Sequence, residues 1–332
     1  MSVTIKDIAK LANVSHTTVS RALNNSPLIK EKTKKKILDI ANQLNYIPDY
    51  HAKNLVMQKS HTIGLFFTSM GTGTSPSFLV DTIRGVNRII DVQYNLFVRG
   101  IDDYADFSYI NNKRFDGIIL MSQSDRDNMF IYNIIEKQIP LVVLNRQVDD
   151  DAVMNILSND KEGAYEAGEY FISSGHKDLA IIEGIQGFKS TQQRRDGFLQ
   201  SLIDNGITIR QEYIVQGNYD MQSGYEAMCK LLDLPNRPTA VFCSNDDMAI
   251  GALNAVFERN LSVPHDISVI GFDDIESAKY TNPSLTTVKR PIEKISMAGV
   301  EAILSLINGK ENLQKKTFIN TELIRRKSVK SL

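Results

Sequence analysis

Residues 4–24 read TIKDIAKLANVSHTTVSRALN, and this stretch predicts two short helices joined by a tight turn. The apolar positions of the first helix recur on one face at helical spacing: Ile8, Ala9 and Ala12. Thr4, followed three residues later by Asp7, matches a capping box that marks where the first helix begins. Asn13 interrupts the apolar pattern, and Ser15 is a candidate cap for the second helix. The stretch therefore predicts a compact helix-turn-helix.

The second helix of this stretch has two faces of opposite character. Its apolar residues Val19, Ala22 and Leu23 face inward, and its polar residues Thr17, Arg21 and Asn24 fall at i, i+4 and i+7 on the other side. Hydrogen-bonding side chains on a helix that a packed neighbour presents are what the reading of a DNA major groove requires. The alternative is a small two-helix cap whose polar face meets only solvent, so the rest of the chain must decide.

The charge distribution along the 332 residues favours the DNA-binding interpretation. The whole chain carries a net charge of only −1, which by itself predicts no polyanionic partner. Residues 1–60, however, hold ten lysines and arginines against four acidic residues, a net charge of +6, and the remainder carries −7. A basic end on an acidic body is typical of a nucleic-acid-binding module attached to a second functional unit.

Composition and motifs exclude several other classes of protein. Apolar residues make up 42% of the chain, enough for a sizeable core. The two cysteines, Cys229 and Cys243, and the five scattered histidines show no metal-ligand spacing, so no metal or cofactor is expected. No signal segment or run of about 18 apolar residues occurs, and we expect a cytoplasmic protein without a membrane partner. The GxSxG, P-loop, GxGxxG and HExxH motifs are also missing, which argues against an enzyme.

Two further segments extend the basic end of the chain. A third helix is expected from about Lys30, and lysines at positions 32 and 34–36 lie near its start. Residues 50–59, YHAKNLVMQK, could form only a short helix that is marginal in water when isolated. This segment is either a plain linker or a hinge that becomes helical when paired on DNA. In the second case Leu55 could insert as an apolar wedge into the minor groove.

From Ser60 the pattern changes to alternating strands and helices. The first expected strands are residues 62–68, 94–99, 115–122, 141–145 and 153–158, with helices at about 79–91, 106–113 and 126–138. The second expected strands are residues 179–184, 213–217, 240–245, 268–273 and 317–324, with helices at about 161–173, 191–204, 220–232 and 246–259. Such alternation predicts parallel sheets covered by helices on both faces. The polar break at residues 145–151 favours two sheets over one large sheet.

Polar side chains gather at the ends of the expected strands. They are Ser69, residues 122–124, Asn145, Arg146, the loop 184–195 with Ser190, Tyr219, Asn245, Asp246, Asp273 and Asp274. Ligands of parallel sheets bind outside the carboxyl ends of the strands. Hydroxyls, amides, carboxylates and arginines can together pair the donors and acceptors of a small polyhydroxylated or heterocyclic ligand.

The whole chain resembles the lactose-repressor/galactose-repressor (LacI/GalR) family of bacterial transcription regulators. The blocks that carry the resemblance are TIKDIAKLANVSHTTVSRALN, LNYIPDYHAKNL, DGIIL, PLVVLNR, GHKDLAIIEG, RRDGF, NDDMAIGAL, VIGFDD and LTTVKRP. The resemblance implies an all-α helix-turn-helix headpiece (1–47), a hinge helix (48–60) and an α/β core (61–332) of periplasmic-binding-protein type. It places about 61–158 with 290–318 in one doubly wound parallel-sheet subdomain, and about 159–289 with 319–332 in the other.

The resemblance also implies roles for particular residues. His16, Thr17 and Arg21, with Asn24, are expected to read bases, Thr4, Ser15 and Ser20 to contact phosphates or cap helices, and Leu55 to be the hinge wedge. Arg194 is expected to clamp the effector, with Arg195 as the alternative. Tyr219 could stack on the effector, and Asn245 and Asp273 could hold the hydroxyls of the effector. We add Ser69, Arg146 and Ser190 from the strand ends. The loop at residues 69–78 departs from the family pattern by five extra glycine, threonine and serine positions, which leaves the role of Ser69 open.

Together these observations predict a homodimeric repressor on a pseudo-palindromic operator, whose DNA affinity is controlled by a small molecule in the cleft between two subdomains. A sugar or sugar derivative is the effector that the resemblance implies. A nucleobase co-repressor and a phosphorylated carrier protein remain alternative triggers. A transport-type solute-binding protein is a more distant alternative, which the basic headpiece disfavours.

Overall fold

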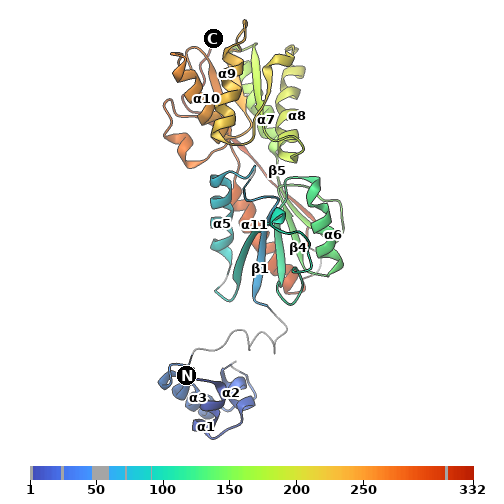
Figure 1. Ribbon diagram of the computed structural model, residues 1–332, viewed down its shortest axis with the longest axis vertical. Coiled ribbons are helices and arrows are strands. Elements are labelled where there is room, and N and C mark those ends of the chain that lie inside the picture. Colours follow the sequence, from blue (N-terminus) through green and yellow to red (C-terminus); the bar gives the residue numbers. More distant parts are fainter. Residues whose placement is uncertain (1–2, 24–25, 47–59, 72, 91, 311–312) are drawn as a thin grey trace. The chain divides into compact units, whose positions relative to one another are not determined.

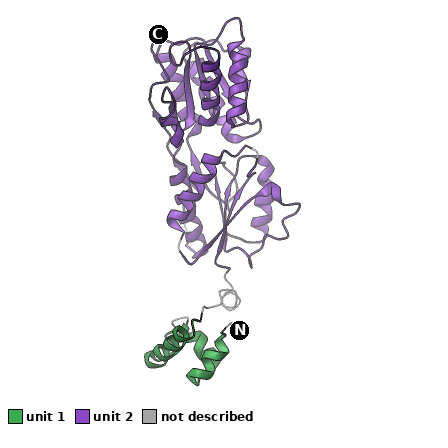
Figure 2. Ribbon diagram, turned by 60° about the vertical axis from the view of Figure 1, so that its left-hand side comes forward, with its two compact units in different colours: residues 1–59 green, residues 60–332 purple. Residues whose placement is uncertain are grey.

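The structure is a computed structural model that describes residues 3–23, 26–46, 60–71, 73–90, 92–310 and 313–332. The chain divides into two compact units, residues 1–59 and residues 60–332 (Figures 1 and 2). The expected hinge helix at residues 50–59 with its wedge Leu55, and the expected base-reading residue Asn24, lie outside the described residues.

The described residues of the first unit form three helices around a small apolar core. They are α1 (Ile5–Ala12), α2 (His16–Leu23) and α3 (Glu31–Gln43). Ile8, Val19 and Ile37, one from each helix, are fully buried in a single cluster. Asn13 ends α1 in the left-handed conformation (φ 57°), which asparagine tolerates better than most residues. The predicted helix-turn-helix is confirmed.

The second unit contains two six-stranded sheets, and the first has the order β11-β5-β4-β3-β1-β2 with every strand parallel. Its strands are β1 (Thr62–Phe67), β2 (Asn95–Gly100), β3 (Gly117–Met121), β4 (Leu141–Leu144), β5 (Met154–Ser158) and β11 (Lys316–Ile319). Helices α5 (Pro76–Ile89) and α11 (Ile292–Ile307) pack on one face, and α6 (Asn128–Glu136) packs on the other (Figure 1). Because both faces are covered, β3 is the uninterrupted buried run GIILM.

The second sheet has the order β12-β10-β9-β8-β6-β7. Its strands are β6 (Leu179–Glu183), β7 (Ile214–Gln216), β8 (Ala240–Cys243), β9 (Ser268–Asp273), β10 (Thr286–Lys289) and β12 (Glu322–Ile324). Helices α9 (Met221–Leu232) and α10 (Asp246–Glu258) pack on one face, and α7 (Asp160–Ser173) and α8 (Lys189–Asp204) pack on the other. Strand β12 runs antiparallel to β10, so this sheet is parallel except at one edge.

Three connections carry the chain between the two sheets. The first follows β5 into α7, the second follows β10 into α11, and the third joins β11 to β12. Each subdomain is therefore assembled from separate parts of the sequence. The two doubly wound subdomains that the sequence predicts are confirmed.

Some sequence-based expectations of the fold are wrong. The expected helix at residues 106–113 is a series of turns, because Asp106 and Asn111 accept hydrogen bonds from the amides of Ser108 (2.8 Å) and Lys113 (3.1 Å). Such local side-chain bonds compete with helix formation. The expected single strand at residues 317–324 is two strands that belong to different sheets.

The polar break at residues 145–151 also does not separate the sheets. Strands β4 and β5 lie on either side of the break and pair with each other, with Val142 opposite Met154. The first change of sheet comes after Ser158 instead. Strand β10 and helix α11 are additional elements that the sequence patterns do not predict.

Candidate functional site

The exposed face of α2 presents polar side chains with no partner inside the described headpiece. His16, Thr17 and Arg21 are exposed and Ser20 is half-buried. Within the described residues, no hydrogen bond or ion pair involves the side chain of His16, Thr17 or Arg21. Their donors and acceptors are therefore available to a ligand.

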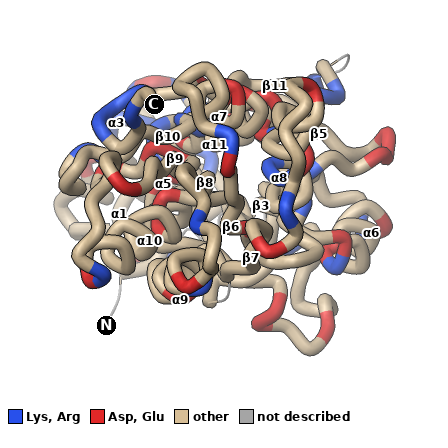
Figure 3. Tube along the Cα trace, turned by 90° about the horizontal axis from the view of Figure 1, so that it is seen from above, with Lys and Arg blue, Asp and Glu red and all other residues tan. Residues whose placement is uncertain are grey.

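The other predicted DNA-contact residues act locally as caps. Ser15 Oγ accepts a hydrogen bond from the Thr18 amide at 3.1 Å and so begins α2. The Asp7 carboxylate accepts hydrogen bonds from the Thr4 amide (2.8 Å) and hydroxyl (2.7 Å), and these bonds lower the pKa of Asp7. Lysines of α3 add positive charge to the same unit (Figure 3). Lys36 binds the carbonyl of Ala12 at 3.0 Å and ties α3 to the end of α1.

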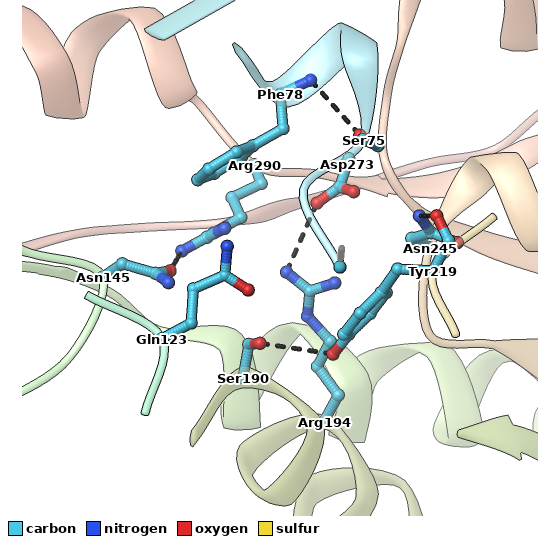
Figure 4. A pocket seen from close by; sticks show the side chains of 11 residues that line it. Ser75, Phe78, Gln123, Asn145, Ser190, Arg194, Tyr219, Asn245, Asp273 and Arg290 are labelled. Atoms are coloured by element: carbon cyan, nitrogen blue, oxygen red, sulfur yellow. Dashed lines mark hydrogen bonds and ion pairs between the residues drawn. The ribbon is translucent and has the colours of Figure 1, made fainter. Parts of the chain in front are cut away.

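A small polar cavity lies in the second unit where strand ends of the two sheets meet (Figure 4). Its volume is about 30 Å³, and its walls are Gly73, Ser75, Phe78, Gln123, Asn145, Ser190, Arg194, Tyr219, Asn245, Asp273 and Arg290. Pockets that hold drug-sized ligands are about 300–1,000 Å³, so this cavity is too small for such a ligand. Across its mouth the amide of Lys189 donates to the carbonyl of Gln123 (2.9 Å), and the Lys189 ammonium pairs with Asp125 (3.4 Å).

Five of the seven predicted effector residues line the cavity: Ser190, Arg194, Tyr219, Asn245 and Asp273. Ser69 and Arg146 are not among the residues of its walls. The carbonyl of Ser69 accepts from the Thr74 hydroxyl at 2.6 Å. Arg146 is buried and directed elsewhere, because its guanidinium binds Ser122 (2.8 Å), Asp125 (3.0 Å) and Asn128 (2.8 Å).

The remaining cavity residues are outside the set of expected effector contacts: Gly73, Ser75, Phe78, Gln123, Asn145 and Arg290. Gln123 and Asn145 nevertheless belong to the polar residues expected at the strand ends. Gln123 and Asn145 follow β3 and β4, so the rule that ligands bind outside the carboxyl ends of parallel strands (the strand-end rule) covers both. Asn145 lines the cavity, whereas its neighbour Arg146 does not. Arg290 follows β10 and would have been found by the same rule had that strand been predicted. Gly73, Ser75 and Phe78 belong to the extended loop and to the start of α5, where no strand-end signal exists.

Three cavity residues hold backbone conformations that side chains rarely adopt. The φ angles of Asn145, Tyr219 and Asp273 are 76°, 65° and 113°. Left-handed residues other than glycine cost free energy and cluster at ligand sites. Further contacts fix Tyr219, since its hydroxyl binds Thr191 (2.7 Å) and Asn245 binds its carbonyl (3.0 Å). A Cβ on Gly184 would come within 2.0 Å of the ring, so only glycine permits this placement.

Two arginines and two carboxylates form a buried network beside the cavity. Arg194 pairs with Asp160 at 2.9 Å and with Asp273 at 3.3 Å, and Arg290 pairs with Asp160 at 3.1 Å. Burial tends to raise the pKa of Asp160, but Arg290 and Arg194 overcome this effect and hold the pKa below its ordinary value. Burial raises the pKa of Asp273 to about 6 despite the opposing effect of Arg194. Fixed donors and acceptors of this kind suit the hydroxyls of a small ligand.

Other kinds of site have little support in the described part of the chain. Its histidines, cysteines, aspartates and glutamates form no group that could hold a metal ion. Its helices also include none that is both long and apolar enough to cross a membrane.

The headpiece and core together define a helix-turn-helix DNA-binding regulator with a ligand-binding core of periplasmic type. Residues 4–49 match the family model described as bacterial regulatory proteins, lacI family, and residues 169–329 match the periplasmic binding protein-like domain. The chain is 66% identical over 330 residues to the "Probable HTH-type transcriptional repressor ExuR" of Bacillus subtilis (strain 168), with 99% of each chain covered. The chain belongs to the LacI family of bacterial transcription regulators.

Other relatives agree with this assignment. The HTH-type transcriptional repressor PurR of Actinobacillus pleuropneumoniae serotype 3 (strain JL03) is 35% identical over 339 residues, with 99% of each chain covered. A crystal structure of the lac repressor dimer bound to operator and the anti-inducer ONPF is 25% identical, with a TM-score of 0.85 over 99% of this chain and 100% of that chain. The protein is therefore a transcriptional repressor with effector-regulated DNA binding, and not an enzyme.

Proposed function

We propose that the effector is a sugar or sugar derivative that binds in the cavity between the two subdomains. The observation that carries this proposal is the Arg194–Asp273 pair in the cavity wall (3.3 Å), which offers a fixed donor beside a fixed acceptor. Adjacent hydroxyls of a sugar can bond to both at once. Ser190 and Gln123 also line this cavity and add a hydroxyl and an amide (Figure 4).

The effector has to open the cleft before it can bind. A cavity of about 30 Å³ cannot contain a sugar, and contacts across the mouth hold the subdomains together. Effector binding therefore selects a different closure angle, and operator affinity changes by the ligand's differential affinity for the two states. In this proposal residues 48–60 form the hinge that joins the core (61–332) to the headpiece (1–47). Leu55 in the hinge and Asn24 in the headpiece keep their predicted DNA contacts.

On the DNA side, we infer that α2 enters the major groove of the operator. The exposed guanidinium of Arg21 can bridge the O6 and N7 atoms of a guanine, and His16 and Thr17 lie on the same helix. Ser15, Ser20 and Thr4 lie at or near helix starts, where amides and hydroxyls can contact phosphates. Such a regulator acts where the chromosome is, so we place it in the cytoplasm.

We further propose that the protein is a homodimer on a pseudo-palindromic operator. Helices α9 and α10 border a groove of about 400 Å³ whose walls include Met221, Tyr225 and Phe257. Phe257 is 79% exposed at this groove, so it is available to a second copy of the chain. A Phe257→Asp substitution should shift the protein to monomers in analytical ultracentrifugation, whereas Ile203→Asp on α8 should leave the dimer intact.

A thermal-shift screen of sugars, sugar phosphates and nucleobases tests the effector proposal. A ligand of the native cavity raises the melting temperature by mass action. The compound that does so should bind Arg194→Lys much more weakly in calorimetry, because lysine cannot replace the guanidinium fork. Arg195→Lys is the matched control, since Arg195 is half-exposed and pairs with Glu183 at 3.0 Å instead of facing the cavity. A nucleobase hit without any sugar hit, or equal weakening by both variants, would reject the proposal.

A further inference from the structure

The three connections between the subdomains are held together by side chains that lie outside the cavity wall. Asn159, in the first connection, donates from its amide to the Asn320 side chain of the third at 2.9 Å, and its carbonyl accepts from the Thr321 hydroxyl at 3.3 Å. A Cβ on Gly163 would lie within 2.6 Å of Thr321 and 2.7 Å of Val288, so α7 starts directly against the third connection and β10. The first and third connections and strand β10 are therefore in direct contact.

Asp160 joins these connections to the cavity. One carboxylate oxygen (Oδ1) accepts from the Ser158 hydroxyl and pairs with Arg290 Nε at 3.1 Å, and both residues belong to the connections. The other oxygen (Oδ2) accepts from Arg194 Nε at 3.0 Å and pairs with Nη2 at 2.9 Å. Asp160 is 1% exposed, so solvent does not weaken these bonds.

Arg290 extends the same network into the first subdomain. Its guanidinium donates to the Ser158 hydroxyl at 2.9 Å and to the side-chain oxygen of Asn145 at the end of β4. Arg194, on α8 of the second subdomain, meanwhile binds the carbonyl of Ser244 and the carboxylate of Asp273. The carboxylate of Asp160 thus lies between two arginines, each of which holds a different subdomain.

We propose that Asp160 is a positioning residue that locks the closure angle of the two subdomains and transmits the state of Arg194 to the connections. This inference rests on the proposed effector cavity, because Arg194 is the group that an effector would engage. A ligand that replaces Asp273 as a partner of Arg194 changes the position of the guanidinium. The two bonds from Arg194 to Asp160 then pass that change to Arg290 and the three connections.

The test measures the closure angle in the ligand-free full-length protein, so that it depends on neither effector nor DNA. Spin labels on Met129→Cys of α6 and Ile203→Cys of α8 report the separation of the subdomains by electron paramagnetic resonance. Both positions are exposed, at 77% and 60%. Cys229→Ser removes the partly exposed native thiol, and Cys243 is fully buried. Asp160→Asn should turn a narrow distance distribution into a broader and longer one.

Asp127→Asn is the matched control, because Asp127 is buried to a similar degree yet its carboxylate bonds within the first subdomain, to the hydroxyls of Thr68 and Ser122 at 2.6 Å each and to the amide of Gln123 at 3.3 Å. It should reduce the melting temperature and leave the distance unchanged. Arg290→Lys keeps the positive charge but loses the forked guanidinium, and it should open the cleft as Asp160→Asn does. If Asp160→Asn does not fold, the distance measured in Arg290→Lys alone tests the proposal. Wild-type distances in Asp160→Asn and Arg290→Lys would overturn the proposal, while leaving the effector site itself untouched.

Discussion

The proposed DNA-reading face of α2 and the proposed effector cavity use polar residues in opposite ways. On α2, His16, Thr17 and Arg21 are exposed and bind nothing else in the described headpiece. In the cavity, Arg194 is 2% exposed and already paired with Asp160 and Asp273. One surface is ready for its partner, whereas the other must exchange internal bonds for ligand bonds.

Because of this difference, substitutions on the exposed face of α2 should affect binding but not stability, whereas substitutions in the cavity should affect both. A side chain on the exposed face of α2 can change with little cost to the fold, so DNA specificity can vary without loss of stability. A change in the cavity leaves a buried charge without its partner, which destabilises the core. Effector specificity is therefore expected to change through paired substitutions.

The largest effect should follow from the removal of Arg194. Arg194→Leu removes the positive charge that balances the buried carboxylates of Asp160 and Asp273. Loss of one partner of a buried ion pair lowers the free energy of unfolding by about 3–5 kcal/mol. Arg195→Leu removes a half-exposed partner of Glu183 and should cost less than about 1 kcal/mol. Urea unfolding of the core measures both, and similar losses in the two variants would contradict the assigned network.

A pH effect of opposite sign in the two regions should come next. The pKa of Asp273 is raised to about 6 from 3.8, so the folded state holds this proton more tightly and its stability contribution falls as pH rises from about 4 to about 6. At about 1.4 kcal/mol for each pKa unit, the loss is about 3 kcal/mol. Asp273→Asn should remove that loss from the pH profile of unfolding, and an unchanged profile would exclude Asp273 as the titrating group.

The headpiece should show the reverse trend. Hydrogen bonds from Thr4 lower the pKa of Asp7, so its contribution to α1 is present at neutral pH and is lost as pH falls through the folded pKa. Hydrogen exchange of the α1 amides at decreasing pH, compared with Asp7→Asn, measures this contribution.

Arg21→Ala should produce a smaller effect that is confined to DNA binding. Loss of a bidentate guanine contact costs about 1–3 kcal/mol of discrimination between operator and random DNA. The free energy of unfolding should stay within about 0.5 kcal/mol of wild type. Lys32→Ala is the control, because an exposed lysine on α3 should weaken binding to both DNAs equally. Full discrimination by Arg21→Ala in a gel-shift titration would exclude α2 as the reading helix.

The smallest effect should come from the cap of α2. Ser15→Ala removes the hydrogen bond from the Thr18 amide and should cost about 1 kcal/mol of local stability. Thr17→Ala, two residues further on, removes no bond within the described headpiece and should leave protection unchanged. Hydrogen exchange of the α2 amides in the full-length protein distinguishes the two.

The same contrast explains how far the sequence predicts this molecule. The helix-turn-helix follows from short-range patterns, because capping and the burial of Ile8 and Val19 depend on residues only a few positions apart. Buried parallel strands such as β3 are equally visible as apolar runs. The helix expected at residues 106–113 is wrong because Asp106 and Asn111 bind nearby amides, and Lys137 adds bonds from a distant helix end to the carbonyls of Phe107 (2.6 Å) and Ile110 (2.7 Å).

The cavity is predictable only in part for the same physical reason. Arg194, Asn245 and Asp273 adjoin strands or helices with clear patterns, so the strand-end rule finds them. Arg290 follows a four-residue strand and reaches Asp160 across 130 positions of sequence, where periodicity carries no information. Arg146 and Asn145 are adjacent, and the bonds of Arg146 to Ser122 and Asp125, together with the left-handed backbone of Asn145, are not visible in the sequence.

Strands β11 and β12 have a consequence for how the protein is made. Residues 316–319 form one edge of the first sheet, and residues 322–324 form one edge of the second. During synthesis on the ribosome both sheets therefore wait for the same short segment, which emerges after all the other strands. The headpiece can fold early, as domains do when they emerge first. A nascent chain thus holds a finished DNA-reading helix before its control unit is complete.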